Sequence, residues 1–224
     1  KIFLTPRRSN GIKLLTFQRN DRNNHQSIRA MKPYDQQGIV MQRESEIERI
    51  TSETSIRAQL TIDGSGQNDI QTGIPFFDHM LTLFSVHGFF DLVLHAEGDL
   101  EVDSHHTVED VGIVLGDALT QALGERKGIR RYGNAITPMD ESLAEIVVDL
   151  SKRPYLVVNL PEYVAVQSNF DYLLLKEFLR AFSNHGGLNL HVNVPYGENE
   201  HHIIEAIFKS FGRALDQACR LDAR

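Results

Sequence analysis

The stretch His-His-Thr-Val-Glu at 105–109 recurs as His-His-Ile-Ile-Glu at 201–205, 96 positions later. Two further matches keep nearly the same offset. Phe-Ser-Val-His-Gly at 84–88 returns as Phe-Ser-Asn-His-Gly at 182–186, and the residues at 115–122 return at 211–218. One such match can arise by chance, but three in the same order indicate a duplicated α/β half.

Hydrophobic periodicity gives both halves an order in which strands alternate with helices. In the first half we expect a strand over 56–62, a helix over 75–88, a strand over 92–95 and a helix over 105–123. In the second half we expect strands over 146–149 and 155–160, a helix over 172–183, a strand over 188–194 and a helix over 200–218. Each half then packs its helices on one face of a small sheet.

Composition bounds the domain organisation. The 224 residues are 41% hydrophobic, which is enough for one domain with a sizeable core or two small fused ones. Residues 1–43 carry a net charge of +7, whereas the remainder carries −14. The basic leader has neither an apolar signal core nor an RNA-binding motif. We therefore expect a flexible extension over 1–45, followed by half-repeats over 46–135 and 136–224.

Two features favour a cytoplasmic protein without membrane or nucleic-acid partners. The longest apolar runs are broken by charges well short of the roughly 20 residues of a membrane span. The single cysteine, Cys219, excludes an internal disulfide framework and favours a reducing compartment. Cys219 continues the apolar pattern of the last helix, so we expect it to pack rather than to act as a nucleophile.

The two His-His-x-x-Glu motifs predict metal binding. Residues i and i+4 share one helix face, so His105 and Glu109 can hold one cation. The following histidine, His106, projects about 100° away and does not easily reach the same ion. Imidazole with carboxylate suits Mn, Fe or Zn better than Ca or Mg. Surface histidines have no reason to repeat in duplicated halves, so the repetition favours a functional role.

The repeat also nominates the remaining ligands. An offset of 98 positions places His79 opposite Glu177, and both side chains can bind metal. A symmetric assignment follows, in which one ion is bound by His79, His106, His201 and Glu205, and the other by Glu177, His202, His105 and Glu109. Spacing alone does not decide whether the ligands meet within one chain or between subunits.

Four longer stretches carry a family resemblance over about 49–224. They are Thr-Gly-Ile-Pro-Phe-Phe-Asp-His-Met-Leu at 72–81, Asp-Ser-His-His-Thr-Val-Glu-Asp at 103–110, Asp-Leu-Ser-Lys-Arg-Pro at 149–154 and Gly-Glu-Asn-Glu-His-His-Ile-Ile-Glu-Ala at 197–206. Together they resemble imidazoleglycerol-phosphate dehydratase. The resemblance implies an α+β fold whose duplicated α/β halves place a helical layer between two small mixed sheets. It also implies two Mn²⁺ ions per subunit, held between the subunits of a 24-subunit homo-oligomer.

The implied reaction is a carbon–oxygen lyase step of histidine biosynthesis. D-erythro-imidazole glycerol phosphate loses water to give imidazole acetol phosphate. Glu53 matches the family's substrate-contacting glutamate and is the expected general acid or base. The other implied substrate contacts are His87, Arg131, Arg153 and Lys209, of which the arginines suit a phosphate by their bidentate fork. The implied catalytic set joins Glu53 to the ligands His79, His105, Glu109, Glu177 and Glu205.

Two departures from the family pattern bear on activity. The family usually has His where this sequence has Glu177, and the carboxylate makes the second site more anionic. The family also ends with a Pro-Ser-Thr-Lys-Gly-like loop that helps to hold the phosphate, whereas the sequence stops at Arg224 before any such segment. Either the sequence is truncated or that contact is absent. Two other interpretations stay open, a different binuclear metal enzyme such as a hydrolase and a catalytically silent, metal-stabilised shell.

Overall fold

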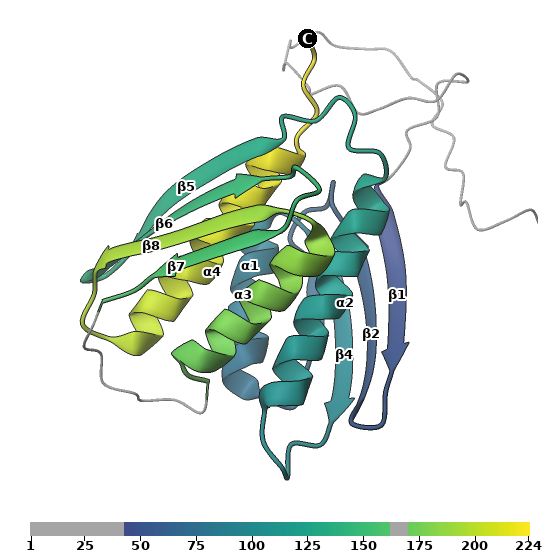
Figure 1. Ribbon diagram of the computed structural model, residues 1–224, viewed down its shortest axis with the longest axis vertical. Helices are drawn as coiled ribbons and strands as arrows, with labels where there is room; N and C mark the ends of the chain where they lie inside the picture. Colours follow the sequence, from purple (N-terminus) through teal and green to yellow (C-terminus); the bar gives the residue numbers. More distant parts are fainter. Residues whose placement is uncertain (1–42, 162–169) are drawn as a thin grey trace, which may run out of the picture. The chain divides into compact units, whose positions relative to one another are not determined.

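The structure, a computed structural model, describes residues 43–161 and 170–224 (Figure 1). The predicted N-terminal extension therefore lies, up to residue 42, outside the described residues. The elements of the first half are β1 (Glu44–Ile50), β2 (Thr54–Thr61), β3 (Asn68–Gln71), α1 (Pro75–Gly88), β4 (Asp91–Gly98) and α2 (His105–Leu123). Those of the second half are β5 (Tyr132–Met139), β6 (Ser142–Asp149), β7 (Tyr155–Asn159), α3 (Tyr172–Gly186), β8 (Asn189–Tyr196) and α4 (Glu200–Cys219).

Both halves build the same four-stranded sheet. The strand order is β1-β2-β4-β3 in one sheet and β5-β6-β8-β7 in the other. In each sheet the last pair, β3 with β4 or β7 with β8, is parallel, and the other pairs are antiparallel. The four helices form a layer between the two sheets (Figure 1). The predicted α+β fold of duplicated halves is confirmed.

The helices of the two halves pair with each other. α2 packs against α3 where Gly116 faces Gly186, and α4 packs against α1 where Gly212 faces Gly88. These two glycine pairs occupy equivalent positions of the repeat. A Cβ on Gly212 would lie 2.4 Å from the carbonyl oxygen of Phe84, so the helix backbones approach too closely for any side chain. The duplication therefore folds as one body related by a pseudo-twofold axis.

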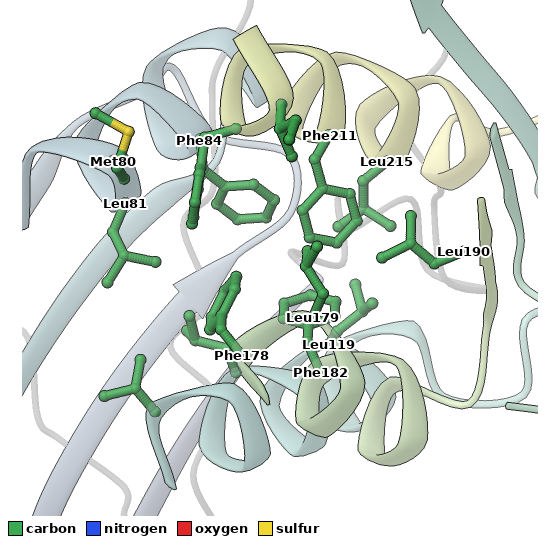
Figure 2. Close-up of a cluster of buried hydrophobic side chains, with 14 of the residues drawn as sticks. Met80, Leu81, Phe84, Leu119, Phe178, Leu179, Phe182, Leu190, Phe211 and Leu215 are labelled. Carbon is green, nitrogen blue, oxygen red and sulfur yellow. The ribbon is translucent and has the colours of Figure 1, made fainter. Parts of the chain in front are cut away.

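Aromatic side chains fill the centre of the helical layer (Figure 2). Phe84 and Phe182 are equivalent in the repeat, and their ring centroids lie 6.1 Å apart. Phe211 contacts both, at 5.2 and 5.1 Å. All three rings are buried, and each contributes roughly 2 kcal/mol to folding. Because a residue contacts its own equivalent only near a symmetry axis, this cluster marks the axis.

The structure adds three strands that hydrophobic alternation did not indicate. β1 is an edge strand whose alternate residues are exposed glutamates, and its other face contributes only Ser45 as a fully buried residue. β3 has four residues, none of them buried. β5 carries Gly133 and Pro138, which are both depleted in strands. Each of these strands is held by its neighbours rather than by a hydrophobic pattern of its own.

The remaining expectations concern the helices. α3 continues three residues beyond the expected end, to Gly186, and Asp171 caps its start by accepting from the N–H groups of Leu173 and Leu174. Cys219 is buried in the core, which raises the pKa of its thiol to about 12 and confirms its packing role. None of the described helices combines the length and the apolar character that a membrane span requires.

Candidate metal centre

Three side chains from two helices converge at one point. His201 and Glu205 lie one turn apart on α4, and His79 lies on α1 beside them. Nε2 of His201 is 3.2 Å and Nε2 of His79 is 3.6 Å from Oε2 of Glu205. The ligand atoms of all three lie within 4.8 Å of one another, and no other such group occurs among the described residues. Two imidazole nitrogens with a carboxylate oxygen are a donor set that Mn, Fe or Zn accepts, so the residues fit the expected metal.

The carboxylate of this group is held in its ionised form. Glu205 is 9% exposed, and its second oxygen, Oε1, accepts a hydrogen bond of 2.6 Å from Nζ of Lys209. Burial alone raises a carboxyl pKa, but the bonds from Lys209 and His201 and the charge of His79 outweigh it and lower the pKa of Glu205. Packing orients the imidazole, because the ring of Phe76 meets that of His201 edge-on at 5.1 Å. The cluster is thus a preorganised ligand group.

The middle histidines of the two motifs lie outside this group. Nδ1 of His106 meets both oxygens of Asp99, at 3.0 and 3.2 Å. Nδ1 of His202 meets Oε2 of Glu141 at 2.6 Å. The hydrogen bond to Asp99 raises the pKa of His106, and the bond from His202 lowers the pKa of Glu141 to about 2. Of the predicted set, His79, His201 and Glu205 therefore lie together within one chain, whereas His106 lies apart from them.

The second predicted ligand set is less complete. Nε2 of His105 lies 3.5 Å from Oε2 of Glu109, and both side chains are nearly half exposed. The third member, Glu177, accepts from Arg180 at 2.9 Å. Gly112 of α2 packs on the backbone of Phe178 of α3, so Glu109 and Glu177 lie at the same end of two adjacent helices. The fourth member, His202, is held by Glu141 as described above.

Comparison with known proteins identifies the relatives of this fold and site. A family model described as imidazoleglycerol-phosphate dehydratase matches residues 72–215. The chain belongs to this family. The imidazoleglycerol-phosphate dehydratase of Syntrophobacter fumaroxidans is 62% identical over 182 residues, which cover 81% of this chain and 92% of the relative. That of Trichlorobacter lovleyi is 59% identical over 184 residues, which cover 82% and 94%.

Solved structures of the family have the same fold. The dehydratase crystal structure from Pyrococcus furiosus matches with a TM-score of 0.71 and 38% identity, over 80% of this chain and 96% of that one. The structure from Staphylococcus aureus matches with a TM-score of 0.71 and 39% identity, over 81% and 99%. As a member of the dehydratase family, the chain is a hydro-lyase.

The cations that the family resemblance assigns to the phosphate lie in two places. Arg131 binds Asp149 through two nitrogens, and its backbone N–H donates to Ala218 near the end of α4. The carbonyl of Arg153 accepts from Asn189, the cross-strand partner of Asp149, so both arginines lie at this end. Lys209 precedes Ala218 by nine residues, which is roughly 13 Å along the helix. One chain does not gather all three cations around one phosphate.

His87, the fourth predicted substrate contact, lies close enough to Lys209 to be affected by its charge. It lies in the last turn of α1, half-buried, and burial together with the charges of Lys209 and Arg213 lowers its pKa. A depression of about 370 Å³ lies beside it and is lined by His87, Phe89, Arg213 and residues of β5 and α4. Arg213 has no carboxylate partner among the described residues, and sequence reasoning did not single it out. The sequence pattern that could have indicated Arg213 is the four-residue spacing of Glu205, Lys209 and Arg213, which places all three on one face of α4.

Glu53, the predicted general acid or base, lies close enough to His106 for its charge to act on that ring. It lies exposed in the turn between β1 and β2, where its backbone N–H donates to Oγ1 of Thr51. The next residue, Thr54, donates to the buried carboxylate of Asp110 on α2. This contact fixes the turn against the start of α2, and the charge of Glu53 contributes to the raised pKa of His106. The expected acid or base therefore lies with the ligand that is missing from the three-residue group.

Proposed function

We propose that the chain dehydrates D-erythro-imidazole glycerol phosphate to imidazole acetol phosphate and water in histidine biosynthesis, with two Mn²⁺ ions per subunit. The convergence of His79, His201 and Glu205 in a chain of this family carries the proposal. One ion is held by these three residues with His106. The other is held by His105, Glu109, Glu177 and His202. When bound, the ions act as Lewis acids that stabilise negative charge on the imidazole ring of the substrate.

We further propose that each site is shared between copies of the chain in a homo-oligomer of 24 subunits. Within one chain His106 lies apart from the three-residue group, bound to Asp99. A second copy that supplies His106 therefore completes the set, and it brings Glu53 with it, because the two residues lie at the same end of the first sheet. A closed assembly repeats such a contact around symmetry axes.

Sharing of the sites between copies would also explain why the predicted phosphate-binding cations lie in two places within one chain. Lys209 borders the three-residue group and His87 lies about two turns further along, beside Arg213, whereas Arg131 and Arg153 lie at the far end of α4. Residues from adjoining copies then hold the phosphate from two sides, with the arginines binding it bidentately. Glu53 moves the proton, as base toward the carbon-bound hydrogen or as acid toward the departing hydroxyl.

The test is turnover of the purified full chain with imidazole glycerol phosphate. We expect chelation to abolish product formation and added Mn²⁺ to restore it, with imidazole acetol phosphate as the product. Release of inorganic phosphate instead would indicate a binuclear hydrolase. Substrate binding without turnover, in a chain that holds Mn²⁺, would indicate a silent shell. Either result contradicts the proposal.

A further inference from the structure

The middle histidines of the two motifs share one arrangement that the outer histidines lack. His106 and His202 each direct Nδ1 at a carboxylate, which belongs to Asp99 in one case and Glu141 in the other. The outer histidines, His105 and His201, instead direct Nε2 at the glutamate of their own motif. Within the part of the chain that the structure describes, the carboxylate near Nε2 of His202 is that of the exposed Asp140, at 3.7 Å, beyond hydrogen-bonding distance.

A carboxylate at Nδ1 has a definite effect on a neutral imidazole. An ionised carboxylate can only accept, so the ring proton resides on Nδ1 and the lone pair on Nε2. A metal needs that lone pair, and a carboxylate behind the ring also restricts its rotation and increases its basicity. Asp99 and Glu141 thereby prepare His106 and His202 to bind metal through Nε2.

Glu141 is itself fixed in place. Its Oε1 accepts from Oγ of Ser142 and from the backbone N–H of Asn199, both at 2.9 Å, and its Oε2 serves His202. Asn199 caps α4, the helix that carries His202. The carboxylate therefore ties the β5–β6 turn to the start of the motif helix and holds the ring from a rigid base.

The duplication does not account for this arrangement. Position 99 corresponds to Gly197 in the second half, and position 141, just before β6, corresponds to Glu53, just before β2 in the first half. Asp99 follows β4, whereas Glu141 lies in the hairpin turn between β5 and β6. Two positions that are not equivalent in the repeat thus supply the same contact to equivalent histidines, which points to a requirement of the histidines rather than to an inherited contact.

We infer that Asp99 and Glu141 are positioning residues that set His106 and His202 for metal binding, an inference that rests on the proposed function. The chain offers a matched control. Asp117 meets Nδ1 of His185 at 3.0 Å on the surface, and His185 belongs to neither ligand set. An ordinary surface pair of this kind contributes little to stability.

The experiment measures Mn²⁺ affinity by titration of the full-length chain, with the magnetic-resonance signal of free Mn²⁺ as readout. We expect Asp99→Asn and Glu141→Gln to weaken Mn²⁺ binding roughly 10- to 100-fold at one of the two sites. Asp117→Asn should leave both affinities unchanged. In a His202→Ala background, Glu141→Gln should have no further effect, because the residue acts through that ring.

Three outcomes overturn the inference. Wild-type affinity in Asp99→Asn and Glu141→Gln, with Mn²⁺ binding and turnover intact in the wild type, refutes this inference alone. The same holds for a Glu141→Gln effect that adds fully to that of His202→Ala, because it then reflects the tie to Asn199. A wild-type chain that holds no Mn²⁺ refutes the inference together with the proposed function.

Discussion

The two motif helices, α2 and α4, have the same place in equivalent halves but different surroundings. On α4, Glu205 is 9% exposed, has His79 beside it and is bonded to Lys209. On α2, Glu109 is 44% exposed, and its ion pair among the described residues is with His105. The position equivalent to Lys209 is Ile113, and the position equivalent to His79 is Glu177.

The comparison of the two helices shows that the duplicated halves kept the same backbone packing but acquired different side chains around the motifs. Strand order and the glycine contacts between helices are the same in both halves, because they depend on backbone geometry. The ligands around each motif have diverged, because a few side-chain replacements change the chemistry without changing the packing. Four sets of substitutions test this separation of packing from chemistry.

Removing the motif glutamates should have the largest effect. We expect Glu205→Gln and Glu109→Gln each to lower turnover roughly a thousandfold or more, since each takes a charged ligand from one metal ion. Metal analysis should show each variant losing one ion and keeping the other. Loss of both ions from either variant would mean that the two sites are not separate.

Substitution of Lys209 tests the cation that lies beside the motif glutamate on α4 and is replaced by Ile113 on α2. We expect Lys209→Met to raise KM for the phosphate substrate roughly 10- to 100-fold, the value of a hydrogen bond to a charged group. Mn²⁺ content should not fall, because the cation next to Glu205 competes with the metal. Lys127→Met, at a lysine that is 84% exposed, is the control and should change neither quantity. Metal loss with unchanged KM would assign Lys209 to the metal site instead.

The glycine contacts test what the halves share. We expect Gly116→Ala and Gly212→Ala each to destabilise the fold by about 2 kcal/mol, because a methyl group there meets helix backbone. Thermal melts should fall by roughly 5 °C in both cases. A large loss in one variant and none in the other would contradict the pseudo-twofold axis.

Helix capping should have the smallest effect. Asp171 caps α3 through two hydrogen bonds, whereas Ser104, at the start of α2, makes no side-chain cap bond. We expect Asp171→Ala to cost about 1 kcal/mol and Ser104→Ala to cost almost nothing. Denaturant unfolding compares the two, and equal losses would show that the difference in capping has no energetic consequence.

Much of the fold was predictable from the sequence because its repeats and periodicity are local signals. The bounds of α1 and α2 follow from Pro75 and from the apolar pattern. The edge strands were not predictable, since β1 presents exposed glutamates and β3 has no buried residue. Their pairing depends on partners distant in the sequence.

Some residues of the candidate site were likewise predictable from the sequence, and others were not. Helical spacing predicted the contact of His201 with Glu205, and the repeat offset nominated His79, which the structure brings to them. Spacing gave no sign of Asp99 and Glu141, because they come from loops that the repeat does not relate. Which copy of the chain supplies His106 is a property of assembly that a single sequence does not contain.

Complementation between two inactive variants tests whether copies of the chain share the metal sites. His79→Ala and His106→Ala chains, each inactive alone, are co-expressed with different tags, and the mixed assembly is purified and assayed. Shared sites predict that the mixture regains roughly a quarter of wild-type activity, because an intact group on one chain meets an intact His106 on another. A mixed assembly that forms but stays inactive would show that copies of the chain do not share the sites.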